Sequence, residues 1–106
     1  MSIEDKFGWI GWCKEDNHDK IWGYFYRPTP PDQYYRNCCV FWARRGKAMR
    51  FKADTATYEL TDRLVQSKRR KGYISINQSH LFEIWPTFIE EAEAKLMWDV
   101  LAGKVK

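Results

Sequence analysis

The residues best suited to bind a ligand are a tryptophan and the cations that follow it. The ten residues after Trp42 contain Arg44, Arg45, Lys47, Arg50 and Lys52. An indole can stack on an exposed base, which is worth about 1–3 kcal/mol per base, and a guanidinium can hold a phosphate through two parallel hydrogen bonds. Such contacts position a protein on a nucleic-acid backbone without reading its sequence. The pattern predicts contact with DNA or RNA, and burial of Trp42 in the core is the competing interpretation.

Basic charge is concentrated in the middle of this 106-residue chain, whose net charge is +4. Residues 33–81 contain eleven basic and three acidic side chains, a balance of +8, whereas the remainder is at −4. This imbalance predicts an anionic partner, although surface cations also serve solubility. A second basic run adds to the candidate interface, and it also complements the dipole of the helix that it ends. Its members are Lys68, Arg69, Arg70 and Lys71.

Two hairpins are expected to carry these residues. Residues 7–13 and 20–27 read as paired strands rich in aromatics, and residues 36–43 and 48–52 as a second pair joined by a tight turn through Gly46. The proline-rich residues 28–35 between the hairpins read as a loop. If Phe41 enters the core with Met49 and Phe51, strand alternation brings Trp42 out beside Arg50 and Lys52. The sequence leaves this register open.

Helices are expected after the second hairpin. Asp54 or Thr55 is the predicted cap of a helix that runs to about Lys71. Its narrow buried stripe would contain Ala56, Leu60, Leu64 and Ser67. A short strand over residues 73–76 follows, and Thr87 with Glu90 predicts a capping box for a last helix that ends near residue 102. The fold class is therefore α+β, a small antiparallel sheet with helices on one side.

Several kinds of chemistry find no support. Cys13, Cys38, Cys39, His18 and His80 lack metal-ligand spacing, and three cysteines favour free thiols and a reducing cytoplasm. The chain shows no apolar stretch for a membrane, no secretory signal and no phosphate-binding glycine loop. The cluster of Glu90, Glu91 and Glu93 reads as a solvated helix face. We therefore expect no enzyme activity, cofactor, metal, small-molecule substrate or membrane association.

Residues 19–73 resemble a WGR domain, which is named for a Trp-Gly-Arg motif. The matching segments read DKIWGYFY over residues 19–26, CVFWARRGK over 39–47, RFK over 50–52 and KRRKGY over 68–73. Ala43 stands where the family has glycine. The resemblance implies a small antiparallel sheet with a helix packed across it over residues 1–78. Residues 79–106 would then be a helical extension packed on the same domain.

The resemblance also implies a role. WGR domains of poly(ADP-ribose) polymerases bind DNA near strand breaks, with the motif Trp and Arg at the DNA end, and only Trp42 and Arg44 carry over by position.

Two functions follow from the sequence. The first is binding of DNA or RNA, at the backbone or at the ends, through the basic hairpin and an exposed Trp42. The second is a protein-interaction module that regulates or inhibits a larger nucleic-acid enzyme, because Trp and Tyr are common interface anchors.

Overall fold

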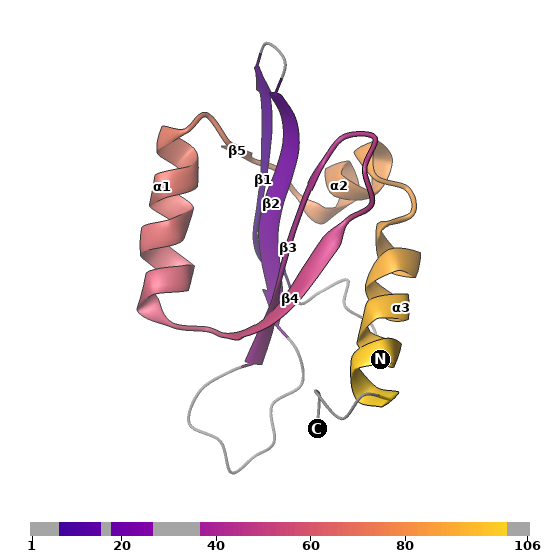
Figure 1. The fold of residues 1–106 in the computed structure, drawn as a ribbon. Coiled ribbons are helices and arrows are strands. Elements are labelled where there is room, and N and C mark those ends of the chain that lie inside the picture. The colour runs from indigo at the N-terminus through magenta and orange to yellow at the C-terminus, as the bar shows by residue number, and fades with distance from the viewer. Residues whose placement is uncertain (1–6, 16–17, 27–36, 102–106) are drawn as a thin grey trace.

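A five-stranded antiparallel sheet forms the centre of the molecule (Figure 1). The computed structural model describes residues 7–15, 18–26 and 37–101. The strands stand in the order β4-β3-β2-β1-β5. Their bounds are β1 Phe7–Glu15, β2 His18–Tyr26, β3 Asn37–Arg44, β4 Arg50–Thr55 and β5 Ile74–Ser75. Both expected hairpins and the short last strand are confirmed, whereas the proline-rich loop lies outside the described residues.

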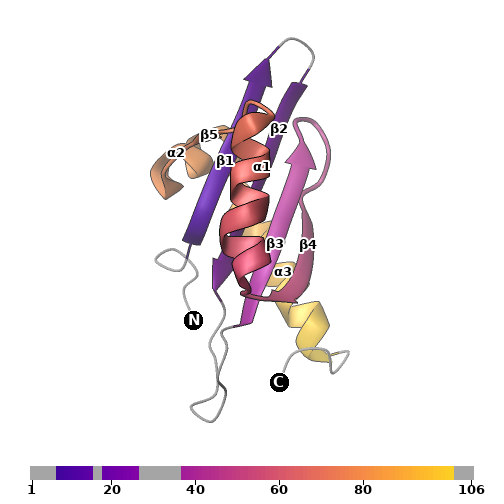
Figure 2. The same cartoon turned by 90° about the vertical axis from the view of Figure 1, so that its left-hand side faces the viewer.

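Helices cover both faces of the sheet, not one as the sequence had suggested. The first face is covered by η1 (Glu59–Leu64) and α1 (Val65–Arg70), which form one continuous helix (Figure 2). The second face is covered by α2 (Gln78–Ile84) and α3 (Phe88–Leu101) (Figure 1). The expected α+β class, with a helix across the sheet and a further C-terminal helix, is confirmed. The short helix α2 was not anticipated.

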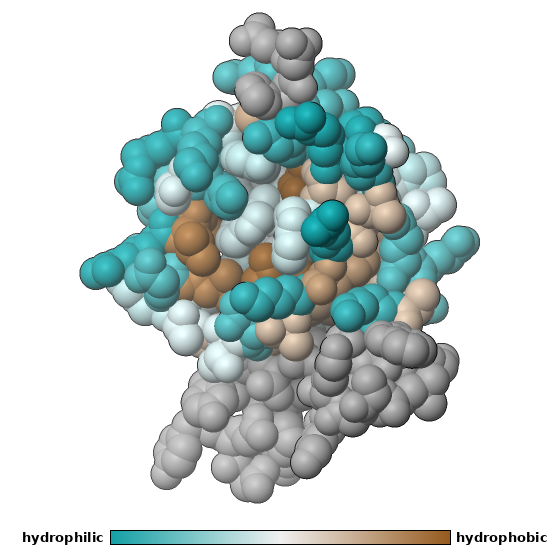
Figure 3. Space-filling model, viewed as in Figure 1, coloured by the Kyte–Doolittle hydropathy of each residue, from teal (hydrophilic) through white to brown (hydrophobic). Residues whose placement is uncertain are grey.

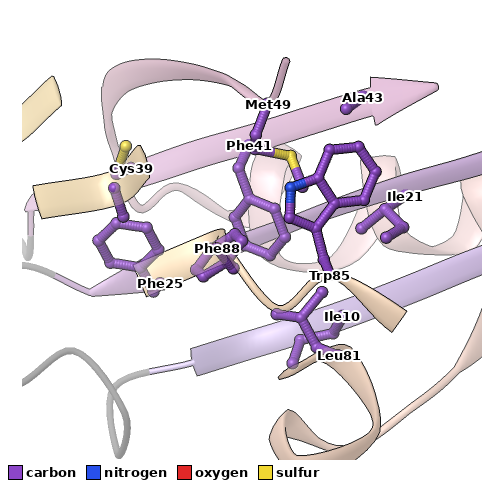
Figure 4. Close-up of a cluster of buried hydrophobic side chains, with 11 residues drawn as sticks. Ile10, Ile21, Phe25, Cys39, Phe41, Ala43, Met49, Leu81, Trp85 and Phe88 are labelled. Carbon is purple, nitrogen blue, oxygen red and sulfur yellow. The ribbon is translucent and has the colours of Figure 1, made fainter. Parts of the chain in front are cut away.

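Strand alternation divides the apolar side chains between two cores. On the α1 face, Trp22, Tyr24 and Val40 pack against Leu60 and Val65. On the opposite face, aromatic side chains of β2 and β3 meet those of the C-terminal helices (Figure 4). Phe25, Phe41 and Phe88 are fully buried there, and the rings of Phe41 and Phe88 lie 4.8 Å apart in an edge-to-face arrangement. The segment from Leu81 to Ala92 thus helps to build the core of the sheet.

The first helix begins later than the sequence indicated. Strand β4 continues through Asp54 and Thr55, so the hydroxyl of Thr57 instead accepts the hydrogen bond from the Leu60 amide, at 3.2 Å. The first turn is π-helical, a wider turn in which hydrogen bonds join residues five apart. Leu60 and Val65 consequently face the sheet, while Leu64 is 38% exposed.

Gly72 ends this helix as expected. Its φ of +99° lies in the left-handed region, where glycine avoids the steric penalty of a Cβ. The Gly72 amide donates to the Arg69 carbonyl, and the Tyr73 amide donates to the Lys68 carbonyl. These two bonds form a Schellman motif, which turns the chain so that Tyr73 enters the sheet-facing core directly below Lys68. Gly46, with φ +89°, makes the tight β3–β4 turn.

The start of α3 uses Glu91 where a capping box with Glu90 was expected. The Thr87 hydroxyl donates to Glu91 Oε2 at 2.8 Å, and the Trp85 indole donates to the same oxygen at 2.7 Å. The Met49 amide donates to Glu91 Oε1 at 2.9 Å. Glu91 therefore does not belong to a merely solvated helix face, because it joins α3 to the segment that precedes β4. Ala92 of α3 is buried in the core, and the side chains after Lys95 lie outside the described residues.

Candidate nucleic-acid interface

The register of β2, β3 and β4 places Trp42 at the centre of a basic surface. Trp42 lies opposite Trp22 on β2 and opposite Arg50 on β4. Residues paired in this way share a face of the sheet, and Lys52 lies on the same face two positions along β4. The indole of Trp42 is 36% exposed. The conditional prediction is thus confirmed: Phe41 is buried in the core, and Trp42 emerges beside Arg50 and Lys52.

A cleft lies between β3 and α1. Its volume is about 410 Å³, and both Trp22 and Trp42 line it. Three cations line it, Lys20, Arg44 and Lys68, with no carboxylate among the lining residues. Lys20 and Arg44 lie opposite each other across β2 and β3. We call this the inner cleft.

Lys68 closes the inner cleft from the helix side. Its ammonium nitrogen lies 5.4 Å from the centre of the Trp22 ring and 5.5 Å from that of Tyr73, within the range of cation–π attraction. Burial lowers the pKa of Lys68, and the nearby charges of Lys71 and Lys20 lower it further. Like charges held together in a partly desolvated cleft are destabilising unless an anion joins them, so the cleft is suited to a phosphate or another anion.

A second groove follows the free edge of β4. Its volume is about 690 Å³, and it too is lined by Trp42. Figure 3, which looks at this edge, shows hydrophilic side chains around apolar surface that remains visible between the helices. The lining combines Arg50, Lys52 and Lys95 with the apolar Met49, Phe51 and Ala94, and Glu91 is its one acid. We call this the edge groove.

Some of the candidate cations lie away from Trp42. Arg45, the first residue after β3, lies on the opposite face, where its guanidinium donates to the Ile84 carbonyl and its Nε lies 3.4 Å from Asp19 Oδ2. Lys47 lies in the same region, beside Trp85 and Pro86. Arg69 stacks over Trp9, 5.5 Å from the ring centre, on the β1 side of α1. Arg70 and Lys71 are exposed at the end of the helix.

Ala43 is one of the residues that line the inner cleft, but its side chain packs on the other face of the sheet. The methyl group belongs to the core of the α2–α3 face, where Ala43 is 7% exposed and lies opposite Ile21. Trp42 and Arg44 point to the other face. Alanine in place of the motif glycine therefore leaves the indole and the guanidinium on the same side of the sheet.

Lys20 and Tyr73 are site residues that the sequence did not single out. Lys20 is brought to the inner cleft by its pairing with Arg44, and Tyr73 by the turn at Gly72. Alternation along β2 assigns Lys20 to the face of Trp22, which is a signal that could have identified it. Nothing in the sequence could have placed the α1 terminus above that face.

Comparisons with protein-family models, with curated proteins and with solved structures find no match for this chain. Within the described residues, no His, Cys, Asp and Glu side chains form a group of three that could hold a metal ion. No helix in that part of the chain combines the length and apolar character needed to cross a bilayer. Cys38 and Cys39 are buried on opposite faces of β3.

Proposed function

We propose that this protein binds nucleic acid through the backbone and an exposed base, at the surface formed by Trp42, Arg44, Arg50, Lys52 and Lys68. The observation that carries the proposal is the exposed indole at the boundary of two basic clefts, one of which has no acidic residue in its lining. Lys20 joins this set because it shares the inner cleft. The resemblance to WGR domains supports the same role.

Phosphate contacts supply the affinity in this proposal, and the indole supplies a stacking platform. Each phosphate neutralised by a cation releases condensed counterions, so affinity falls as salt rises. The proposed surface has five cations when Lys20 is included, which sets an upper limit of about five phosphates. Binding without base-edge contacts should depend little on sequence.

Anisotropy of labelled oligonucleotides tests the proposal. Binding that weakens steeply with salt supports it. Absence of binding to any single-stranded or duplex probe at low salt, where electrostatic attraction is strongest, would contradict it. The basic surface would then be better explained as a site for a protein partner.

A further inference from the structure

We propose that the ligand is single-stranded nucleic acid, which crosses the strands at Trp42 with one base on the indole and backbone phosphates in both clefts. This inference rests on the proposed function and specifies its ligand. It is carried by the position of Trp42, which lines the inner cleft and the edge groove alike.

The two clefts hold different cations. Lys20, Arg44 and Lys68 belong to the inner cleft, and Arg50 and Lys52 belong to the edge groove. Neighbouring strands of a sheet lie about 4.8 Å apart. Measured across the strands, the backbones of β2 and β4 are therefore roughly 10 Å apart, with β3 and its indole between them. Lys20 lies a further two residues along β2 from the row that holds Trp42 and Arg50. A ligand that fits has a flat ring in the middle and an anionic group on each side of it.

A polynucleotide meets this requirement, whereas a free phosphate would occupy one cleft and leave the indole unused. A strand carries a phosphate on each side of every internal base. The path is also open, because β4 is the edge strand and its groove continues from Trp42 to Phe51 and Ala94. Figure 2 shows β4 at the side of the helix on this face, so that the strand is not covered by it.

The indole selects single strands over duplex. Inside a duplex the base faces are stacked on one another, and side chains reach only the base edges and the backbone. Stacking on an aromatic residue requires an unpaired base whose face is free. Trp22, the neighbouring indole, is only 7% exposed and lies under Lys68. Trp42 is therefore the stacking platform of this surface, and one base is expected to stack.

Oligothymidylates from the dinucleotide to the dodecanucleotide, and a blunt duplex of the same final length, provide the test. We expect the single-stranded dodecanucleotide to bind at least about fivefold more tightly than the duplex, since stacking contributes about 1–3 kcal/mol. Affinity should approach its maximum at a length of about four nucleotides, which is the low end of the site sizes of small single-strand-binding domains. Oligouridylates and a 5′-phosphorylated duplex complete the series.

Variants test the two-sided path. Lys20→Ala in the inner cleft and Lys52→Ala in the edge groove should each weaken binding to the dodecanucleotide and reduce the salt slope by about one. Lys47→Ala is the matched control, because Lys47 lies on the other side of the sheet. Thermal unfolding of each variant shows whether the fold is retained.

The outcomes separate this inference from the proposed function. Duplex that binds as tightly as single strand, with steep salt dependence, would overturn the single-strand inference and leave nucleic-acid binding intact. A folded Lys52→Ala protein with wild-type affinity would overturn the two-sided path. Failure of every probe to bind at low salt would overturn both proposals.

Discussion

Trp22 and Trp42 lie opposite each other across β2 and β3, yet Trp22 is 7% exposed and Trp42 is 36% exposed. The difference comes from the helix above them. Lys68 of α1 reaches over the Trp22 ring, whereas Trp42 is one strand further from the helix and borders Arg50 on the edge strand. Two chemically identical side chains therefore have separate roles: Trp22 stabilises the core, and Trp42 is available to a ligand.

Alanine substitutions should separate these roles. Trp42→Ala should weaken binding of single-stranded nucleic acid by about 1–3 kcal/mol and change the free energy of unfolding by no more than about 1 kcal/mol. Trp22→Ala should lower the free energy of unfolding by about 3–5 kcal/mol, because it removes a large buried side chain. Urea titration and anisotropy measure the two effects. The assignment fails if Trp42→Ala unfolds the protein while Trp22→Ala leaves its stability intact.

Because of the π-helical turn, we expect Val65 to stabilise the fold more than Leu64, the opposite of what ordinary α-helical spacing predicts. Val65→Ala should reduce the free energy of unfolding by about 1–2 kcal/mol, because two buried methyl groups are lost. Leu64→Ala removes more atoms but from a partly exposed position, and it should cost less than about 1 kcal/mol. Denaturant unfolding of both variants compares them directly. A larger loss for Leu64→Ala would mean that the helix follows the ordinary α-helical register.

Much of the fold could be predicted because alternation along strands is local. Spacing alone assigns Trp22, Tyr24 and Tyr26 to one face of the sheet and Ile21 and Phe25 to the other. The register that sets Trp42 beside Arg50 could be predicted only conditionally, because it depends on whether Phe41 is buried, which is decided by Phe88 more than forty residues later.

Other features depend on tertiary contacts that spacing does not encode. The π-turn shifts the buried stripe from Leu64 to Val65, and propensity alone does not distinguish these two registers. Arg45 was grouped with the ligand-binding cations because it is adjacent to Arg44. In the fold, Arg45 is the first residue after β3 and lies on the opposite face, where it contacts Asp19 and Ile84. Its contact with the Ile84 carbonyl depends on the position of α2, which is distant in the sequence.

Glu91 should make stability depend on pH in the acidic range. Burial alone would raise the pKa of Glu91, but hydrogen bonds from the Met49 amide, the Trp85 indole and the Thr87 hydroxyl outweigh it, so that the pKa lies below its ordinary value. Its stabilising contribution is then complete above the ordinary pKa of glutamate, about 4.3, and is lost as pH falls through the lowered pKa of the folded state.

Glu91→Gln tests this contribution. The variant should lose about 1–3 kcal/mol at neutral pH, since an amide cannot accept all three hydrogen bonds. The stability difference between wild type and variant should shrink on acidification below about pH 4.3. Glu90→Gln, on the exposed surface of the same helix, is the matched control. A difference that stays constant as the pH falls would argue against this role of the carboxylate.

Lys68 should make nucleic-acid binding sensitive to alkaline pH. Burial, followed by repulsion from Lys71 and Lys20, lowers the pKa of Lys68, so its charge is lost at a lower pH than that of an ordinary lysine. Affinity for an oligonucleotide should therefore decline as pH rises toward the alkaline range. Lys68→Arg should keep its affinity there, because arginine stays protonated. If the affinities of wild type and Lys68→Arg change with pH in the same way, the result would count against this role of Lys68.

The most direct test of the central claim is the salt dependence of oligonucleotide binding by wild type and by Arg44→Glu. Arg44 is an exposed residue of the inner cleft, so reversing its charge should leave the fold intact. The substitution removes one phosphate contact and adds a charge that repels phosphate. The account predicts steeply salt-dependent binding by wild type, with affinity reduced at least about tenfold in Arg44→Glu. Equal affinities and equal salt slopes for the two proteins would contradict nucleic-acid binding at this surface.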